Sequence, residues 1–438
     1  MTELYRLGLR EAALRIRSGM LSSADYTQAL IARIDALEKD VQAWQWLDRD
    51  RALELAKRAD KADRAMRVAH PLHGIPIGVK DLFYTAGIPT EMGCRAYAGY
   101  VPDVTADVVL RLESAGGIMF GKTVTTEAAF MVPAKTRNPW NLRHTPGGSS
   151  SGSAAAVAAG FIAGALGTQT NGSVIRPAAF CGIVGYKPSF GQMSARGMMP
   201  FAQTLDQPGV FARSVVDAAF LASNLTAQRT VITPEVRPLR NAPKLAAVRS
   251  PAWHLAQPAQ RLQFEADIDR VRQAGASVDV LEIAGAFDGA HNIHRTIMLY
   301  EAARLAKKAR EIWRGGFSDY LNRALDEGER LRETDYRDAL KSRTQLQQSL
   351  AEFFDRGYSA IMTPPSAGEA PATVENTGDP RFCTIWTLVG LPAITIPTGK
   401  GRHGMPLGLQ LIGAAEEENY LLATAAWCER YSPFTGLV

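Results

Sequence analysis

The sequence predicts an α/β fold in a single domain, and three observations support this prediction. Between residues 73 and 214, short β-branched runs alternate with helical stretches and many glycines, which indicates helices layered on a largely buried sheet. Strand-like runs return between residues 359 and 412, where they could complete the same sheet. The 438 residues can bury a large core, and neither an internal repeat nor a long linker divides them into independent domains.

Four segments follow one another within this domain. Residues 1–65 are predicted to be a helical lead-in, because a serine pair offers N-caps and apolar residues then recur at helical spacing. Residues 66–215 form the core that carries the motifs described below. Residues 216–375 are richer in charge and helix formers and are predicted to be a variable helical segment, whereas residues 376–438 complete the sheet.

The charge distribution indicates no nucleic-acid partner. The chain has 49 basic and 44 acidic residues, a net charge of +5, and the basic residues are scattered. The densest basic run, residues 304–314, has helical spacing and lacks the interleaved aromatic residues that single-strand binders use. This run is therefore predicted to be the solvated face of a helix.

The sequence also predicts a soluble cytoplasmic protein, either a monomer or a homodimer. Residues 1–11 carry charge where a signal peptide would be apolar, and no window approaches the roughly 18 apolar residues of a membrane span. The cysteines lie far apart and form no CxxC pair, so they are expected to be free and mostly buried: Cys94, Cys181, Cys383 and Cys428.

A serine-rich stretch, Pro-Gly-Gly-Ser-Ser-Ser-Gly-Ser at residues 146–153, runs directly into an alanine-rich helical stretch. A flexible linker would not lead straight into a helix, and a phosphate-binding loop would end in a lysine. The stretch therefore indicates a structured loop at the start of a helix.

Residues 116–123 match the phosphate-loop pattern G-x-x-x-x-G-K-T, but their surroundings do not fit one. A phosphate loop needs a strand, then exposed amides, then a helix. Here residues 107–115 are predicted to be helical, Gly116 to end that helix, and residues 118–120 to form a buried strand. No nucleotide cofactor is expected at this position.

A tight glycine-containing turn at residues 167–178 presents Ser173 between two apolar segments. Together with Lys80 in residues 73–81 and the serine-rich stretch, this turn resembles the amidase signature family. The resemblance extends from about residue 65 to residue 425 through further matches at residues 136–139, 181–188, 205–209 and 404–410. It implies one domain with a mixed, twisted central sheet covered by helices on both faces, and hydrolysis through an acyl-enzyme without metal or cofactor.

Carried over to this sequence, the resemblance makes Ser173 the nucleophile, Lys80 the base, and Ser149 the relaying serine that follows a cis peptide bond. The spacings of 69 residues from Lys80 to Ser149 and 24 from Ser149 to Ser173 are close to those of malonamidase-like members. The oxyanion hole would consist of backbone N–H groups in the turn, those of Thr170, Asn171, Gly172 and Ser173.

Two departures from the family pattern concern the same turn. Many relatives have Asp-x-Gly-Gly-Ser, whereas this chain has Gln-Thr-Asn-Gly-Ser at residues 169–173. Relatives commonly place an arginine two positions after the nucleophile, whereas Arg176 is three positions after it. Arg176 could clamp a substrate carboxylate or pair with a buried acid beneath the turn, and the structural role is favoured.

Met131 matches a position that lines the acyl pocket in relatives, and a core methionine is an equally good interpretation.

A lysine base is chemically demanding. A serine hydroxyl needs a base to remove its proton, and the sequence shows no sign of a histidine-based triad. Lysine serves only when it is neutral, so burial has to lower its pKa by about three units, on the order of 4 kcal/mol. Lys80 ends the run Ile-Pro-Ile-Gly-Val, which has the pattern of a buried strand.

Other polar clusters are expected to be structural. His291 and His294 have helical spacing but no third ligand nearby in sequence, so no metal site is expected; His70 and His73 are expected to be structural or solvated.

The expected substrate is a small-molecule amide, with esters, anilides and carbamates also possible. Two alternatives are an amidotransferase A-type subunit that makes ammonia from glutamine or asparagine within a complex, and a catalytically silent scaffold subunit.

Overall fold

The computed structural model of the chain describes residues 3–226, 232–283 and 285–438. Its strands are β1 Trp44–Leu47, β2 Pro76–Lys80, β3 Ile118–Thr123, β4 Gly164–Gln169, β5 Val184–Lys187, β6 Gln207–Ala212, β7 Lys244–Arg249, β8 Ser277–Glu282, β9 Ala360–Thr363, β10 Ala393–Lys400 and β11 Pro406–Ile412. The described helices are α1 Leu9–Ser18, α2 Ser23–Val41, α3 Arg49–Asp60, α4 Arg64–Ala69, α5 Asp107–Ser114, α6 Ser151–Ala158, α7 Ile175–Cys181, α8 Val215–Ser223, α9 Pro258–Gln273, α10 Ala290–Trp313, α11 Asp319–Arg330, α12 Glu333–Phe354, α13 Arg381–Leu388 and α14 Glu418–Glu429.

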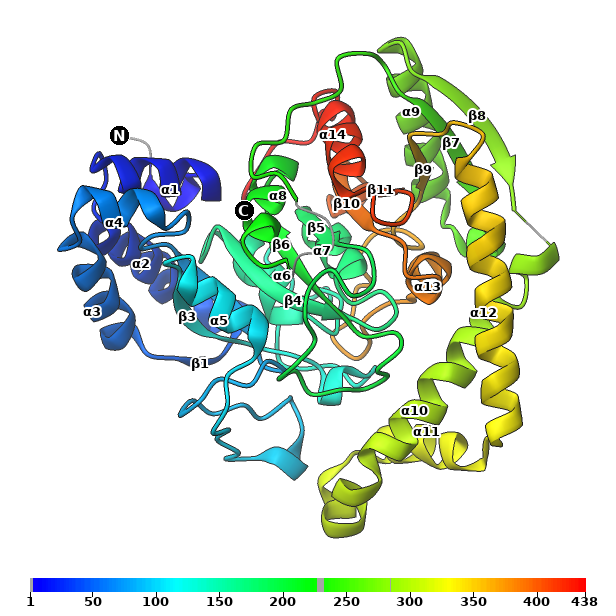
Figure 1. Cartoon of the computed structure of the whole chain (residues 1–438), viewed down its shortest axis with the longest axis horizontal. Helices are drawn as coiled ribbons and strands as arrows, with labels where there is room; N and C mark the ends of the chain where they lie inside the picture. The colour runs from blue at the N-terminus through cyan, green and yellow to red at the C-terminus, as the bar shows by residue number, and fades with distance from the viewer. Residues whose placement is uncertain (1–2, 227–231, 284) are drawn as a thin grey trace.

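One mixed sheet unites these strands in the order β1-β3-β2-β4-β6-β5-β10-β11-β9-β7-β8. β2 runs parallel to β3 and β4, and β7 runs parallel to β8 and β9, whereas the central neighbours pair antiparallel. Helices cover the sheet, and two packed pairs, α6 with α7 and α8 with α14, both contact its central strands (Figure 1). The predicted α/β fold class is confirmed.

The structure corrects two expectations about the segments. The helical lead-in also contains β1, which pairs antiparallel with β3 at the sheet edge. The segment at residues 216–375 contributes β7 and β8 besides the expected strand β9, so it extends the sheet as well as adding helices. β8 escaped prediction because Val278 is its only buried residue, so it lacks the alternation that marks a half-buried strand.

The expected strand after Gly116 is present. Gly116 has a φ of 84° just after α5, and β3 then continues through Lys122 and Thr123, both fully buried. Lys122 Nζ donates to Phe83 O at 2.7 Å and to Thr90 Oγ1 at 2.6 Å. The lysine of the phosphate-loop pattern is therefore part of the sheet interior.

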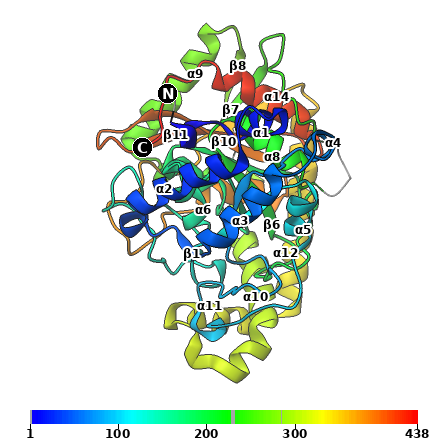
Figure 2. The ribbon, with the colours of Figure 1, turned by 90° about the vertical axis from the view of Figure 1, so that its left-hand side faces the viewer.

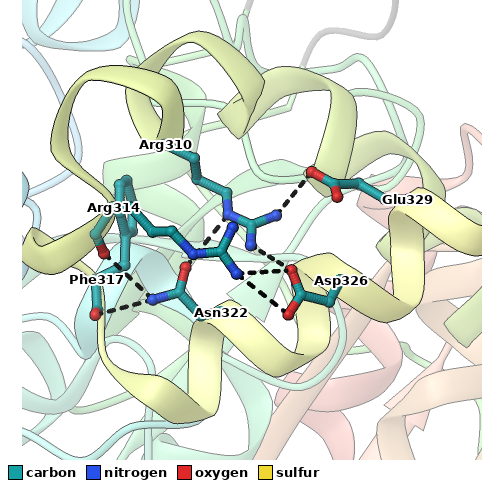
Figure 3. Close-up of polar contacts among 6 residues, drawn as sticks. All are labelled: Arg310, Arg314, Phe317, Asn322, Asp326 and Glu329. Atoms are coloured by element: carbon teal, nitrogen blue, oxygen red, sulfur yellow. Dashed lines mark hydrogen bonds and ion pairs between the residues drawn. The ribbon is translucent and has the colours of Figure 1, made fainter.

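Helices α10, α11 and α12 form an arm on one side of the molecule, whose lower end lies away from the sheet in both views (Figures 1 and 2). At this end Arg310 is buried and donates to Asp326, to Glu329 at 2.8 Å and to Asn322 at 3.2 Å (Figure 3). The prediction of a wholly solvated face for residues 304–314 is wrong for this residue. Arg310 turns towards α11 because two carboxylates there compensate its charge.

The four cysteines are buried free thiols, as expected. Among the described helices, none combines the length and apolar character needed to cross a membrane.

Candidate active site

Lys80 occupies the carboxyl end of β2, fully buried between β3 and β4. Its Nζ lies 2.8 Å from Ser149 Oγ and 2.7 Å from Thr168 Oγ1. Burial lowers the pKa of Lys80 well below its ordinary value, against a smaller opposing effect of the Asp206 charge. The lysine that the sequence selected therefore has the environment that favours a neutral amine.

The serine-rich stretch forms a buried loop at the start of α6, not a linker. The peptide bond between Gly148 and Ser149 is cis. A Cβ on Gly152 would lie 2.3 Å from Ala43 O, so this position requires glycine. The other serines each donate to a backbone carbonyl, Ser150 to Thr168, Ser151 to Gly147 and Ser153 to Leu166. These bonds leave Ser149 as the serine that faces Lys80.

Ser173 lies in the turn between β4 and α7 and lines a cavity of about 450 Å³. The side chain of Gln169 holds the end of this turn, because its Oε1 accepts hydrogen bonds from Val174 N at 2.8 Å and Ile175 N at 3.0 Å. β2 and β4 are neighbouring parallel strands, so their carboxyl ends meet at one edge of the sheet. The fold thus brings Lys80, the serine loop and this turn into one region.

Comparison with known proteins agrees with this arrangement. The sequence profile of the family described as Amidase matches residues 25–422. The chain belongs to the amidase family. The A-type subunit of glutamyl-tRNA(Gln) amidotransferase from Anaeromyxobacter dehalogenans (strain 2CP-C) is 34% identical over 481 aligned positions, covering 98% of this chain and 96% of the relative. The protein of the same name from Roseiflexus sp. (strain RS-1) is 33% identical, covering 96% of each.

Solved structures of amidases are similar along their whole length. A crystal structure described as an amidase is 31% identical with a TM-score of 0.86, covering 97% of this chain and 99% of its own. Native peptide amidase from Stenotrophomonas maltophilia is 26% identical with a TM-score of 0.83, covering 99% and 98%. Family membership and fold are thus shown, whereas the malonamidase-like spacing remains a prediction.

Arg176, on α7, is fully buried beneath the loop that carries Ser149. Its Nε donates to Thr377 O at 2.8 Å, and its Nη2 donates to Gly148 O at 2.7 Å. Burial lowers the pKa of Arg176 to about 10. The structural role was expected to involve a buried acid, but the hydrogen bonds go to carbonyl oxygens, which can accept them without a second charge.

We expect Arg176→Leu to slow the cleavage of acidic and neutral amides equally and to lower thermal stability. The substitution leaves the two carbonyl oxygens without donors, at a cost of about 1–3 kcal/mol for each buried group. Thermal unfolding and kcat/KM on matched acidic and neutral amides measure the two effects. A carboxylate clamp predicts a different result, namely a selective loss of about thirty-fold or more on the acidic amides alone.

Aromatic and sulfur-containing side chains form one wall of the cavity beside Ser173. Phe130 stacks on Phe201 with ring centroids 5.2 Å apart, and Tyr320 of α11 lies 5.7 Å from Phe130. Met131 and Met298 also line this cavity, so the structure places Met131 where the family resemblance suggested. The wall can therefore receive an apolar or aromatic group next to the reacting bond.

Two of the three arginines that line the same cavity are paired with carboxylates, whereas Arg176 donates to neutral oxygens. Arg381 binds Asp379 through two nitrogens, at 2.5 to 3.0 Å, and Arg295 binds Glu327 at 2.5 and 2.8 Å. A charged group that binds Arg295 or Arg381 would have to displace one of these bonds, whereas a neutral substrate would leave them intact.

The wall is fixed by a contact between the arm and the loop that precedes Phe130. Ser318, at the start of α11, donates to the carboxylate of Glu127 through its hydroxyl and through its N–H at 2.8 Å. The next two residues, Ala128 and Ala129, have φ values of 47° and 60°, a left-handed conformation that costs of order 1–2 kcal/mol per non-glycine residue. The middle segment therefore shapes the cavity both by lining it and by holding the loop that carries Phe130.

Several polar residues near Ser173 were not selected from the sequence. Thr168 is the second hydroxyl at Lys80, and Asp206 accepts a hydrogen bond from Thr170 Oγ1 at 2.6 Å. Asp206 lies in residues 205–209, one of the stretches that match the family, but its position in the sequence does not indicate that it accepts a hydrogen bond from Thr170. His294 lines the cavity as a hydrogen-bonding residue, and no group of three metal-binding side chains is found within the described ranges.

Proposed function

We propose that this chain hydrolyses an amide C–N bond through a covalent acyl-enzyme on Ser173, with Ser149 as proton relay and Lys80 as base. The observation that carries the proposal is the buried Lys80 Nζ, 2.8 Å from Ser149 Oγ, whose pKa is lowered by burial. An amine that is neutral near pH 7 can accept the proton that a serine hydroxyl must lose.

The proposed reaction proceeds in two balanced steps. Ser173 Oγ attacks the carbonyl carbon while its proton passes to Ser149, whose own proton passes to Lys80, and the carbonyl π electrons move to oxygen. Collapse of this intermediate breaks the C–N bond, and the proton returns through Ser149 to the leaving nitrogen. Water then attacks the acyl-enzyme by the same route and releases the acid. The N–H groups of Thr170, Asn171, Gly172 and Ser173 would stabilise the oxygen that becomes negative.

The cavity supports a neutral small-molecule substrate with an apolar or aromatic group. One wall consists of Phe130, Phe201 and Tyr320, and two of its arginines, Arg295 and Arg381, are engaged with carboxylates. Aryl amides, esters, anilides and carbamates fit this description. A larger cavity of about 650 Å³ lies around Cys94 and Lys135 and does not include Ser173, so it contributes nothing to this proposal.

The second candidate function is that of an amidotransferase A-type subunit, which releases ammonia from glutamine or asparagine within a complex. Curated relatives with 29–34% identity over 94–99% of the chain carry the name of the A-type subunit of glutamyl-tRNA(Gln) amidotransferase. Their names support this alternative better than the stand-alone small-molecule function. Both candidates use the same cleavage of a C–N bond and differ in substrate and partners.

A matched substrate panel separates the two candidates. We expect the isolated chain to cleave neutral aryl amides, anilides or carbamates faster than glutamine, asparagine or carboxylate-bearing amides, because one wall of the cavity is aromatic and Arg295 and Arg381 are already paired with carboxylates. Release of amine or ammonia gives the rates. If glutamine is preferred, and the partner proteins of an amidotransferase raise its turnover, the amidotransferase function is correct. Labelling of Ser173 by a fluorophosphonate excludes the silent scaffold.

A further inference from the structure

Two side chains from distant helices hold the backbone of the turn that carries Ser173. His294 Nε2 of α10 lies 2.9 Å from Thr170 O, and Thr387 Oγ1 of α13 donates to Asn171 O at 2.5 Å. These partners are 124 and 216 residues away from the turn in sequence. The turn is thus fixed from outside through its carbonyl oxygens.

Fixing a carbonyl oxygen also fixes the N–H of the same peptide unit. In a trans peptide the C=O and N–H bonds point in opposite directions. The hydrogen bond at Thr170 O therefore directs the N–H of Asn171 away from His294. The bond at Asn171 O likewise directs the N–H of Gly172 away from Thr387. In the part of the chain that the structure describes, neither N–H donates to a protein acceptor.

His294 is suited to a fixed position by its burial and its neutral charge. Its side chain is almost fully buried, and burial lowers the pKa of its imidazole to about 4, so the ring is neutral near pH 7. A carbonyl oxygen only accepts hydrogen bonds, so Nε2 must carry the hydrogen. Thr170 is held from a second direction, because its hydroxyl donates to Asp206 at 2.6 Å.

We infer that His294 is a positioning residue for amide cleavage, which holds the N–H of Asn171 towards the oxygen of the tetrahedral intermediate. The inference rests on the proposed function, because this N–H matters only if an oxyanion forms next to Ser173. When Ser173 Oγ bonds to the carbonyl carbon, negative charge develops on the carbonyl oxygen. The N–H of Asn171 can then donate a hydrogen bond to this oxygen without first changing its orientation. Loss of His294 leaves the donor present but free to move.

The test compares variants that keep or remove the donor at similar side-chain size. His294→Met and His294→Phe both lack it, whereas the amide of His294→Gln can donate to Thr170 O. Removing an oxyanion donor outright costs about 100- to 1000-fold in kcat, so loss of its positioning should cost about 10- to 100-fold. We expect this loss in kcat for the Met and Phe variants with KM changed less than about three-fold, and recovery of most of it in the Gln variant.

The matched control is His73, whose Nε2 lies 2.9 Å from Ala59 O, the same buried imidazole-to-carbonyl contact before β2. His73→Met should lower the melting temperature without lowering kcat. A Gln variant as slow as the Met and Phe variants, or wild-type kcat in the variants without a donor, would overturn the inference. The Ser173→Ala variant distinguishes this from failure of the proposed function, since retained turnover there overturns the acyl-enzyme itself.

Discussion

Replacement of Ser173 by alanine should abolish turnover while leaving the fold intact. The hydroxyl supplies the bond to the acyl group, and no other group in the proposed mechanism can replace it. Ser173 lines the cavity, so removal of its hydroxyl leaves no gap within the packed core. Knocking out the nucleophile of a serine hydrolase costs on the order of a million-fold in kcat, and only catalysis by the remaining groups survives.

The experiment measures kcat together with covalent labelling by a fluorophosphonate and with thermal unfolding. Ser250 provides the matched control, because it is also buried, with an Oγ that has no hydrogen-bond partner, and it does not line the cavity. Ser250→Ala should keep both activity and labelling at Ser173. Turnover of the Ser173 variant above a hundredth of the wild-type rate would remove Ser173 as the nucleophile.

The motifs around Lys80, Ser149 and Ser173 could be predicted because each depends on a short stretch of sequence. A buried strand that ends in lysine, a serine loop that enters a helix, and a glycine-containing turn are local patterns, and the structure places each as expected. The phosphate-loop pattern at residues 116–123 could be rejected on local grounds as well, since a helix precedes it and most of it is a buried strand.

The partners that hold these motifs could not be predicted, because they come from distant parts of the chain. His294 and Thr387 reach the turn from α10 and α13, and which residue of a helix faces a turn depends on how the helix packs. The same limit applies to β7 and β8, because β7 pairs with β9 and β8 then pairs with β7 at the sheet edge. The composition of β8 alone resembles that of a solvated segment, whereas β7 has only four apolar residues between a lysine and an arginine.

Replacement of Lys80 by methionine should lower kcat by about a thousand-fold or more, because it removes the base that a general-base mechanism requires. Ser149→Ala should cause a loss of similar size, and the double variant should be little slower than either single variant, since the two residues act as one relay. Losses that multiply in the double variant would contradict a relay.

The pH dependence gives an independent check: kcat/KM of the wild type should rise with pH through the lowered pKa of Lys80 and level off above it.

The same substitution should raise thermal stability near pH 7. The folded pKa of Lys80 lies below its unfolded value, so the unfolded chain binds more protons and Lys80 costs stability at any pH below the unfolded pKa. The gain from Lys80→Met should therefore shrink as pH approaches about 10.4, the ordinary lysine value.

Lys122 is the matched control, a buried lysine on the adjacent strand that forms an ion pair with Asp81 at 3.4 Å. Lys122→Met should lower the melting temperature, because it leaves a buried carboxylate without its partner. Equal destabilisation by both substitutions would show that Lys80 is a structural cation and would remove it as the base.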